Sequence, residues 1–342
     1  MTGKEILKKA IHLEPTDRAP VIILSGGVWA YNQVGKSLQD SFDMSPEESS
    51  DFWVETNKRL QSDLIWCAAG CNNLGLRGIG AEANFSKVGV AASVKPCISA
   101  ASDVDKLDIG KIKEDPGVQA MLASTKLMKE KMGNDTLLAV SQWGPMTLAS
   151  LMLGAEDFMI MLRKDAEGAK YVMDFTKELV VEYWNLFIEA GVEHVSQAEP
   201  VASGDMISPK MFAKVALPYL QYTNKAIGDK ATKMLHICGN TNRLFEMIPE
   251  TGTQMFSMDY KVDLALAREK MGGKVAFAGI IDPAEVMLMS SPEVVAEDAK
   301  RCLTEAQWEK GGFILMPGCD LAPATPWENL ESMVKVAHET KQ

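Results

Sequence analysis

Short apolar runs that end in glycine, proline or a polar residue recur along the whole chain. A run of this length and composition predicts a buried β-strand bounded by a turn. Eight runs qualify, and they are residues 19–24, 63–67, 136–141, 192–197, the run from 234 that contains His236, 253–258, 274–281 and 312–316.

Segments with the length and pattern of helices separate most of these strands. They are the N-terminal segment and residues 46–60, 116–132, 155–162, 165–190, 208–227, 292–310 and 326–340. Ser208 and Pro209 supply an N-cap and a proline at the first helical position. Residues 72–100 are rich in glycine and valine with short alternations, which predicts a hairpin excursion.

Strands that alternate with helices indicate a parallel sheet, either open and doubly wound or closed into a barrel. We predict the barrel, an α/β fold of the (β/α)8 TIM type, with a hairpin insertion near residues 72–100. The strand count is eight, and no Gly-x-Gly-x-x-Gly follows the first strand. Polar residues also fall just past strand ends, where such barrels carry their sites. We expect one domain over residues 1–342.

Composition and charge exclude several classes of partner. The chain is 46% hydrophobic and 24% charged, which allows a sizeable core, and its net charge is -11. An acidic chain is poorly suited to nucleic acid or to an anionic membrane surface. The N-terminus has no apolar signal-peptide core, and no run approaches the length of a membrane span. We therefore expect a cytoplasmic protein.

The candidate chemistry lies at two strand ends. His236 and Cys238 are two residues apart, so they face the same side of an extended strand. Cys319 follows Pro317 and Gly318 at the end of the last predicted strand. One imidazole and two thiols suit Zn²⁺, and three protein ligands with an open position are typical of catalytic zinc. The alternative is a core histidine with two buried thiols.

Further polar residues belong to the same predicted barrel mouth. We predict Glu199 and Asp259 as catalytic residues and Trp143 and Asp282 as cofactor-binding residues. Glu199 could be a fourth ligand, an acceptor that orients His236, or a cap on backbone amides. Asp259 and Asp282 could position substrate or transfer protons, or could cap the helices that follow. Trp143 and Trp29 could form apolar walls or ordinary core.

Several motifs together resemble the uroporphyrinogen decarboxylase superfamily over nearly the whole chain. They are Asp17-Arg-Ala-Pro-Val21, Gly144-Pro-Met-Thr-Leu-Ala149, Ala198-Glu-Pro-Val-Ala-Ser-Gly-Asp205, Leu235-His-Ile-Cys-Gly-Asn240, Pro317-Gly-Cys319 and Pro323-Ala-Thr-Pro-Trp-Glu-Asn-Leu330. The resemblance implies a (β/α)8 barrel. The His-x-Cys and the late Pro-Gly-Cys are similar to the corrinoid-linked methyltransferase branch, in which this set binds zinc, and this implies zinc on His236, Cys238 and Cys319.

Two departures refine what the resemblance implies. Decarboxylases of this superfamily carry an arginine-rich segment after the first strand, whereas residues 25–35 here contain no arginine. The motif that commonly reads Asp-Pro is Glu199-Pro200. We therefore expect a zinc-dependent methyltransferase that works with a corrinoid-carrying partner protein on a small thiol or methyl ether. A porphyrin-pathway decarboxylase and a non-catalytic corrinoid-protein-binding barrel are the alternatives.

Overall fold

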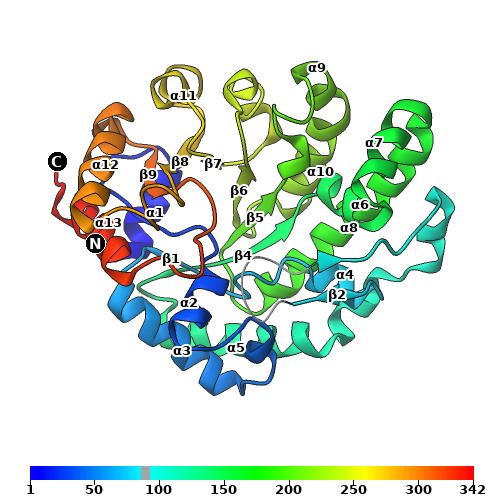
Figure 1. Cartoon of the computed structure of the whole chain (residues 1–342), viewed down its shortest axis with the longest axis horizontal. Helices are drawn as coiled ribbons and strands as arrows, with labels where there is room; N and C mark the ends of the chain where they lie inside the picture. The colour runs from blue at the N-terminus through cyan, green and yellow to red at the C-terminus, as the bar shows by residue number, and fades with distance from the viewer. Residues whose placement is uncertain (86–92) are drawn as a thin grey trace.

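A curved parallel sheet forms the centre of the molecule (Figure 1). The computed structural model describes residues 1–85 and 93–342. Seven strands are hydrogen-bonded in the order β1-β4-β5-β6-β7-β8-β9. They are β1 (Leu64–Trp66), β4 (Leu137–Trp143), β5 (His194–Ala198), β6 (Thr232–Ile237), β7 (Met255–Met258), β8 (Ala276–Ile281) and β9 (Phe313–Pro317). Each coincides with a strand predicted from the sequence.

Helices surround this sheet (Figure 1). Their bounds are α1 (Gly3–Ile11), α2 (Gly27–Gln33), α3 (Pro46–Leu60), α4 (Leu74–Gly78), α5 (Pro116–Met132), α6 (Pro145–Leu153), α7 (Ala155–Lys164), α8 (Ala166–Glu189), α9 (Pro209–Met211), the π-helical turn η5 (Phe212–Ala216), α10 (Leu217–Ile227), α11 (Leu264–Met271), α12 (Pro292–Glu305) and α13 (Trp327–Glu339). The prediction found the long helices but missed the short ones, α2, α4, α6 and α11, which have few residues from which to read a period.

The parallel arrangement places all carboxyl ends of the strands on one side. Each strand after β4 pairs with the strand before it in the chain, so each connection crosses over through helical segments. Every residue of β8 and β9 is buried. Strands covered on both faces explain why the sequence shows continuous apolar runs rather than alternation.

The predicted first strand, residues 19–24, is not a strand of the sheet. It forms one parallel bridge, between Val21 and Leu315, and lies between β9 and β1. Ile22 donates to the Leu315 carbonyl at 3.0 Å, and Asp63 donates to the Val21 carbonyl at 2.9 Å. Pro20 has no N–H, and the Val21 N–H donates to the Asp63 carboxylate instead of to a carbonyl. These two features interrupt the ladder.

The predicted hairpin near residues 72–100 is present in part. β2 (Ala83–Asn84) and β3 (Ser93–Val94) pair in antiparallel fashion. Residues 86–92 of this prediction lie outside the described residues. The segment begins with the short helix α4 rather than with a strand. Leu74 and Leu76 of this helix are buried.

Within the described residues, no helix by itself is long and apolar enough to cross a membrane. α6 and α7 pass that test together by length and composition, but the chain bends by 110° between them. Nearly all of α6 is buried inside the protein, which accounts for its apolar composition.

Candidate metal centre

His236, Cys238 and Cys319 meet at the carboxyl end of the sheet. β6 and β9 are separated by β7 and β8, so their strand ends are not adjacent. One donor atom from each of the three residues nevertheless lies within 4.8 Å of the others. His236 Nε2 is 3.0 Å from Cys238 Sγ, and the two sulfurs are 3.7 Å apart. The loops after β6 and β9 thus lean over the sheet toward each other.

Close packing of these loops holds the cluster together. The Asp259 carboxylate accepts hydrogen bonds from the backbone N–H groups of Gly239 and Lys261, at 2.8 and 3.0 Å. It therefore fastens the loop after β6 to the loop after β7. A Cβ on Gly318 would lie 2.5 Å from the Tyr260 nitrogen, so only glycine lets the β9 loop come this near.

A serine on β7 sets the orientation of the imidazole. His236 is 4% exposed, and its Nδ1 lies 2.7 Å from Ser257 Oγ, which is also fully buried. For Nε2 to present a lone pair to a metal, Nδ1 must carry the proton and donate it to Ser257. This outer hydrogen bond is the kind that fixes the tautomer of a metal-ligating histidine. The sequence alone does not indicate Ser257, because it reaches His236 only through the pairing of β6 with β7.

The thiols of Cys238 and Cys319 are hydrogen-bonded to each other at 3.7 Å. This hydrogen bond lowers the pKa of Cys238. The same hydrogen bond, together with burial, raises the pKa of Cys319.

The donor set fits Zn²⁺. One imidazole nitrogen and two sulfurs match the borderline-soft preference of that ion. The imidazole is oriented, one thiol is already acidified, and the described residues supply three donors at this point. Three protein donors leave a fourth position for substrate, as in catalytic rather than structural zinc sites.

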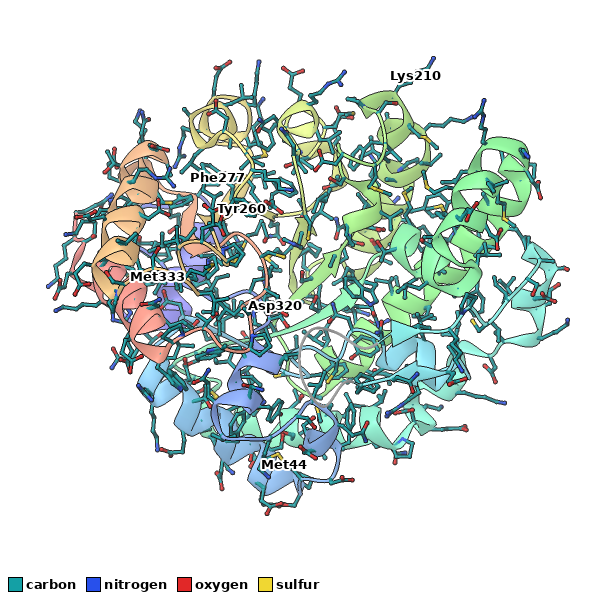
Figure 2. All side chains as sticks on the ribbon, in the orientation of Figure 1. Met44, Lys210, Tyr260, Phe277, Asp320 and Met333 are labelled. Carbon is teal, nitrogen blue, oxygen red and sulfur yellow. The ribbon has the colours of Figure 1, made fainter. Side chains whose placement is uncertain are left out.

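A cavity of about 110 Å³ opens beside the cluster. Trp143 forms one wall, with its indole nitrogen donating to Asn73 Oδ1 at 2.6 Å. Asp320 lies near the centre of the molecule's face in Figure 2 and accepts from the backbone of Gly26 and Leu321, both at 2.9 Å. Burial raises the pKa of Asp320 to about 6. The cavity is lined by Leu24, Ser25, Gly70, Asn72, Asn73, Ser141, Trp143, Ala198, His236, Cys238, Cys319 and Asp320.

The sequence prediction missed part of this lining. The predicted hairpin excursion includes Asn72 and Asn73, whereas the structure brings both to the cavity. Ser141 and Ala198 lie on β4 and β5 and also face it. Strand alternation was the available signal, since Ser141 shares a face with Trp143.

Glu199 is engaged at the start of α6. Its carboxylate accepts from the backbone N–H groups of Met146 and Thr147, at 2.8 and 2.9 Å, and from the Thr147 hydroxyl at 2.6 Å. Burial raises its pKa to about 7, although these three bonds act in the opposite direction. A Cβ on Gly144 would come within 2.4 Å of the carboxyl group. Glu199 is thus a helix cap, and it is not among the residues that line the cavity.

Other predicted site residues lie apart from the cavity. Asp282 accepts from Ala284 and Glu285 at 2.8 and 2.9 Å, a local cap on the turn after β8. Trp29 is fully buried, donates to the Thr325 carbonyl at 2.8 Å and is core.

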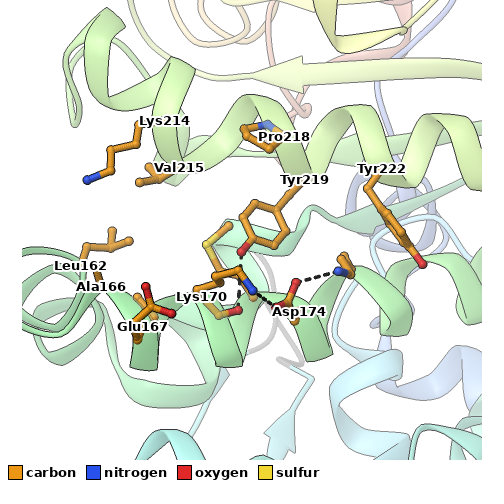
Figure 3. Close-up of a pocket in the computed structure, with 13 residues that line it drawn as sticks. Leu162, Ala166, Glu167, Lys170, Asp174, Lys214, Val215, Pro218, Tyr219 and Tyr222 are labelled. Atoms are coloured by element: carbon orange, nitrogen blue, oxygen red, sulfur yellow. Dashed lines mark hydrogen bonds and ion pairs between the residues drawn. The ribbon is translucent and has the colours of Figure 1, made fainter.

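A larger hollow lies outside the sheet, between α8 and the segment formed by η5 and α10 (Figure 3). Its volume is about 450 Å³. Asp174 forms ion pairs with Lys170 and Lys177 at 2.9 and 2.6 Å, and the Tyr219 hydroxyl donates to the Lys170 carbonyl. One carboxylate thus pairs with two lysines, and the lining has no histidine or cysteine. The hollow therefore lacks the reactive groups found at the strand ends.

The fold and the site together are typical of an enzyme of the α/β barrel class. The protein has a parallel α/β sheet of barrel-like curvature, with an imidazole and two thiols at the carboxyl ends of its strands. That is the end at which barrel enzymes of this kind carry their active sites.

The chain belongs to the uroporphyrinogen decarboxylase family, whose model, described as Uroporphyrinogen decarboxylase (URO-D), matches residues 2–340. The chain is similar to the methylcobamide:CoM methyltransferase MtbA of Methanosarcina acetivorans, with 27% identity covering 99% of this chain and 98% of that protein. It is also similar to the uroporphyrinogen decarboxylase of Citrifermentans bemidjiense, with 28% identity and 95% coverage of both proteins.

A solved structure gives the same relationship. A methyltransferase from Methanosarcina mazei superimposes with a TM-score of 0.88 at 25% identity, covering 99% of both chains. The resemblance stated from the sequence motifs is confirmed. Relatives with two different activities share nearly the same percentage identity with this chain. The residues of the site must therefore indicate which of the two activities is the better proposal.

Proposed function

We propose that the protein is a zinc-dependent methyltransferase. It would move a methyl group between a corrinoid held by a partner protein and a small substrate, either a thiol such as coenzyme M or a methyl ether. The observation that carries this proposal is the meeting of His236, Cys238 and Cys319 at the strand ends. Relatives named as methylcobamide:CoM methyltransferases support it.

The residues of the site would divide the work. His236, Cys238 and Cys319 would hold zinc, which when bound supplies a Lewis acid that acidifies a thiol or polarises an ether oxygen. Ser257 would keep the imidazole in the ligating orientation. Asp259 would hold the Cys238 loop in place through Gly239. Trp143 would form an apolar wall that excludes water from the substrate.

Glu199 and Asp282 would support the site without taking part in the chemistry. Glu199 would act from the start of α6, by fixing the segment that follows β4, because both of its oxygens are engaged there. Asp282 would shape the rim after β8 through its local cap. Neither carboxylate would touch the substrate.

The decarboxylase alternative is less well supported by the site. Uroporphyrinogen carries many carboxylates, and these would require cationic partners. The described residues that line the cavity include no lysine or arginine, and residues 25–35 contain no arginine. The cavity, at about 110 Å³, is also smaller than the roughly 300 Å³ of typical sites for larger ligands.

Three broader features belong to the same proposal. Residues 19–24 would take the eighth strand position of a closed (β/α)8 barrel, since they lie between β9 and β1. Residues 1–342 would form one domain. A cytoplasmic location is in keeping with six cysteines that are all free.

Metal analysis tests the proposal. Purified wild-type protein should hold about one zinc per chain, as three-ligand sites do, and Cys238→Ala and Cys319→Ala should lose it. Cys97→Ala is the control, because this half-buried thiol lies outside the cluster. His236→Ala should abolish methyl transfer to or from a corrinoid protein. Wild type without metal, or unchanged transfer in His236→Ala, would contradict the proposal; decarboxylation of uroporphyrinogen would then favour the alternative.

A further inference from the structure

A cavity rich in lysine opens at the amino ends of the strands, the end opposite the metal centre. Its volume is about 390 Å³. Most of its lining lies just before or at the first residues of β5, β6 and β7, whereas the metal donors lie at the carboxyl ends. This lysine cavity is lined by Lys8, His12, Glu193, Asp229, Lys230, Ala231, Thr232, Lys233 and Gln254. The proposed methyl transfer uses none of them.

The lysine cavity has an excess of positive charge in a chain whose net charge is -11. Its lining holds three lysines and two carboxylates. Glu193, one of these carboxylates, is already engaged in ion pairs with three lysines. They are Lys4, Lys8 and Lys129. Glu193 is therefore more than offset, and the cations of the cavity are not neutralised by its lining.

Lys233 is a buried cation in this cavity. It is 8% exposed, and its ammonium group donates to the Gly228 carbonyl. Among the described residues Lys233 forms no ion pair, and an ammonium group has two further donors to offer. Burial lowers the pKa of Lys233, and the charge of Asp229 opposes this only in part. Because a buried charge is costly unless it is paired, the cavity is suited to an anion from outside the chain.

Lys230 supplies another cation at the rim of the cavity. It is exposed, and its Nζ donates to the neutral Asn185 Oδ1 at 3.2 Å. Within the described parts of the chain it has no carboxylate partner. Asp229 is the like charge that a bound anion would meet, but it is exposed, so solvent and salt screen it.

The size and the charges of the cavity indicate the class of ligand. A volume of about 390 Å³ lies within the roughly 300–1,000 Å³ of small-molecule sites. Lysine is a common partner of phosphate, which offers several acceptor oxygens and up to two negative charges. A membrane surface or a nucleic acid carries many charges over a wide area and would be repelled by the net negative charge of the chain.

We propose that the lysine cavity is a second binding site, which takes a small molecule that carries phosphate groups. Lys233 is its buried anchor, and Lys230 binds from the rim. The ligand supplies the negative charge that the described lining does not. This site does not depend on the proposed function, because it shares no residue with the metal centre.

Calorimetric titration of the purified wild-type protein tests the proposal with three matched probes. Fructose 1,6-bisphosphate, fructose 6-phosphate and fructose share one sugar and carry two, one and no phosphate groups. Affinity should fall in that order, by about tenfold for each phosphate lost, as for hydrogen bonds to charged groups. Added salt should weaken binding of the bisphosphate, because charges in an open cavity are screened.

Charge-changing variants locate the site. Lys233→Gln can still donate to the Gly228 carbonyl, and loss of the buried charge should weaken bisphosphate binding by about tenfold or more. Lys230→Gln, at an exposed position, should weaken it by about threefold, whereas Asp229→Asn removes a like charge and should tighten it by about threefold. Lys300→Gln is the control, because Lys300 is exposed on α12 outside the cavity. This variant should bind as wild type does.

Defined outcomes overturn the proposal. They are equal binding of fructose and the bisphosphate, binding of neither phosphate compound, and unchanged binding in both lysine variants of the cavity. Weaker binding in Asp229→Asn also contradicts it, because loss of a carboxylate can favour an anion only if the anion binds nearby. Sedimentation with phosphatidylglycerol vesicles, without binding of the bisphosphate, would assign the lysines to a lipid surface instead.

Discussion

Replacement of Ser257 by alanine tests whether the imidazole is held for metal binding. His236 Nδ1 and Ser257 Oγ are 2.7 Å apart and both side chains are buried, so water cannot replace the lost hydroxyl. One buried hydrogen bond contributes about 1–1.5 kcal/mol, which is close to a tenfold change in an equilibrium constant. Loss of outer partners of metal ligands has effects of roughly 10–100-fold. We expect Ser257→Ala to weaken zinc binding by about tenfold.

Competition for zinc with a chromophoric chelator at constant pH measures this affinity. Ser196→Ala is the matched control, because Ser196 is a buried serine on β5 whose hydroxyl has no partner among the described residues. It should bind zinc as wild type does. Ser257→Thr keeps a hydroxyl and should recover most of the affinity. The reasoning is refuted if Ser257→Ala binds zinc within twofold of wild type, or if Ser196→Ala loses as much.

Glu199→Ala leaves two buried N–H groups at the start of α6 unpaired, so urea denaturation should show a loss of about 2 kcal/mol. Gly239→Ala should weaken zinc binding and destabilise the protein, because Gly239 has φ +80° and its Cβ would lie 2.4 Å from Asp205 Oδ2. Burial lowers the pKa of His194 to about 3 from 6.5. As the pH falls, His194 therefore takes up a proton in the unfolded chain before it does so in the folded protein. The free energy of unfolding should fall by about 2 kcal/mol between pH 7 and pH 5, and His194→Gln should remove this loss.

Each of these predictions has a defined contradiction. A Glu199→Ala variant within 0.5 kcal/mol of wild type would show that its hydrogen bonds do not stabilise α6, on the scale of roughly ±0.5 kcal/mol typical of neutral substitutions. Gly273→Ala separates strain from crowding, since Gly273 has φ +77° but open space around its Cβ. Equal zinc affinity in both glycine variants would refute the crowding argument. Equal acid sensitivity of wild type and His194→Gln would assign that sensitivity to other groups.

Strand positions were predictable because burial on both faces leaves a local signature. The apolar runs at 136–141 and 274–281 coincide with β4 and β8, since each must fill the sheet's two faces with apolar side chains. The run at 19–24 carries the same signature, yet Pro20 and the bond from Val21 to Asp63 interrupt its ladder. That bond joins residues 42 positions apart and leaves no trace in local composition.

The amino-acid sequence by itself determined which residues could bind metal. His236 and Cys238 share a side through the two-residue period of a strand, and Cys319 follows another strand end, so the local pattern was sufficient to nominate all three. The structure confirms that they come within reach of one another. Glu199 and Asp282 are also predicted as site residues because they follow strand ends. A carboxylate in that position can serve equally well as a cap on backbone N–H groups.

Only the tertiary structure decided among such roles. Glu199 is a cap because the start of α6 lies against it, and Asp320 faces the cavity because two backbone amides hold it there. Ser257 lies 21 residues after His236 in the chain. It supports His236 because the parallel register of β6 and β7 places the two residues side by side. Chain composition specifies which groups are available, whereas the directions of hydrogen bonds between distant segments specify what each group does.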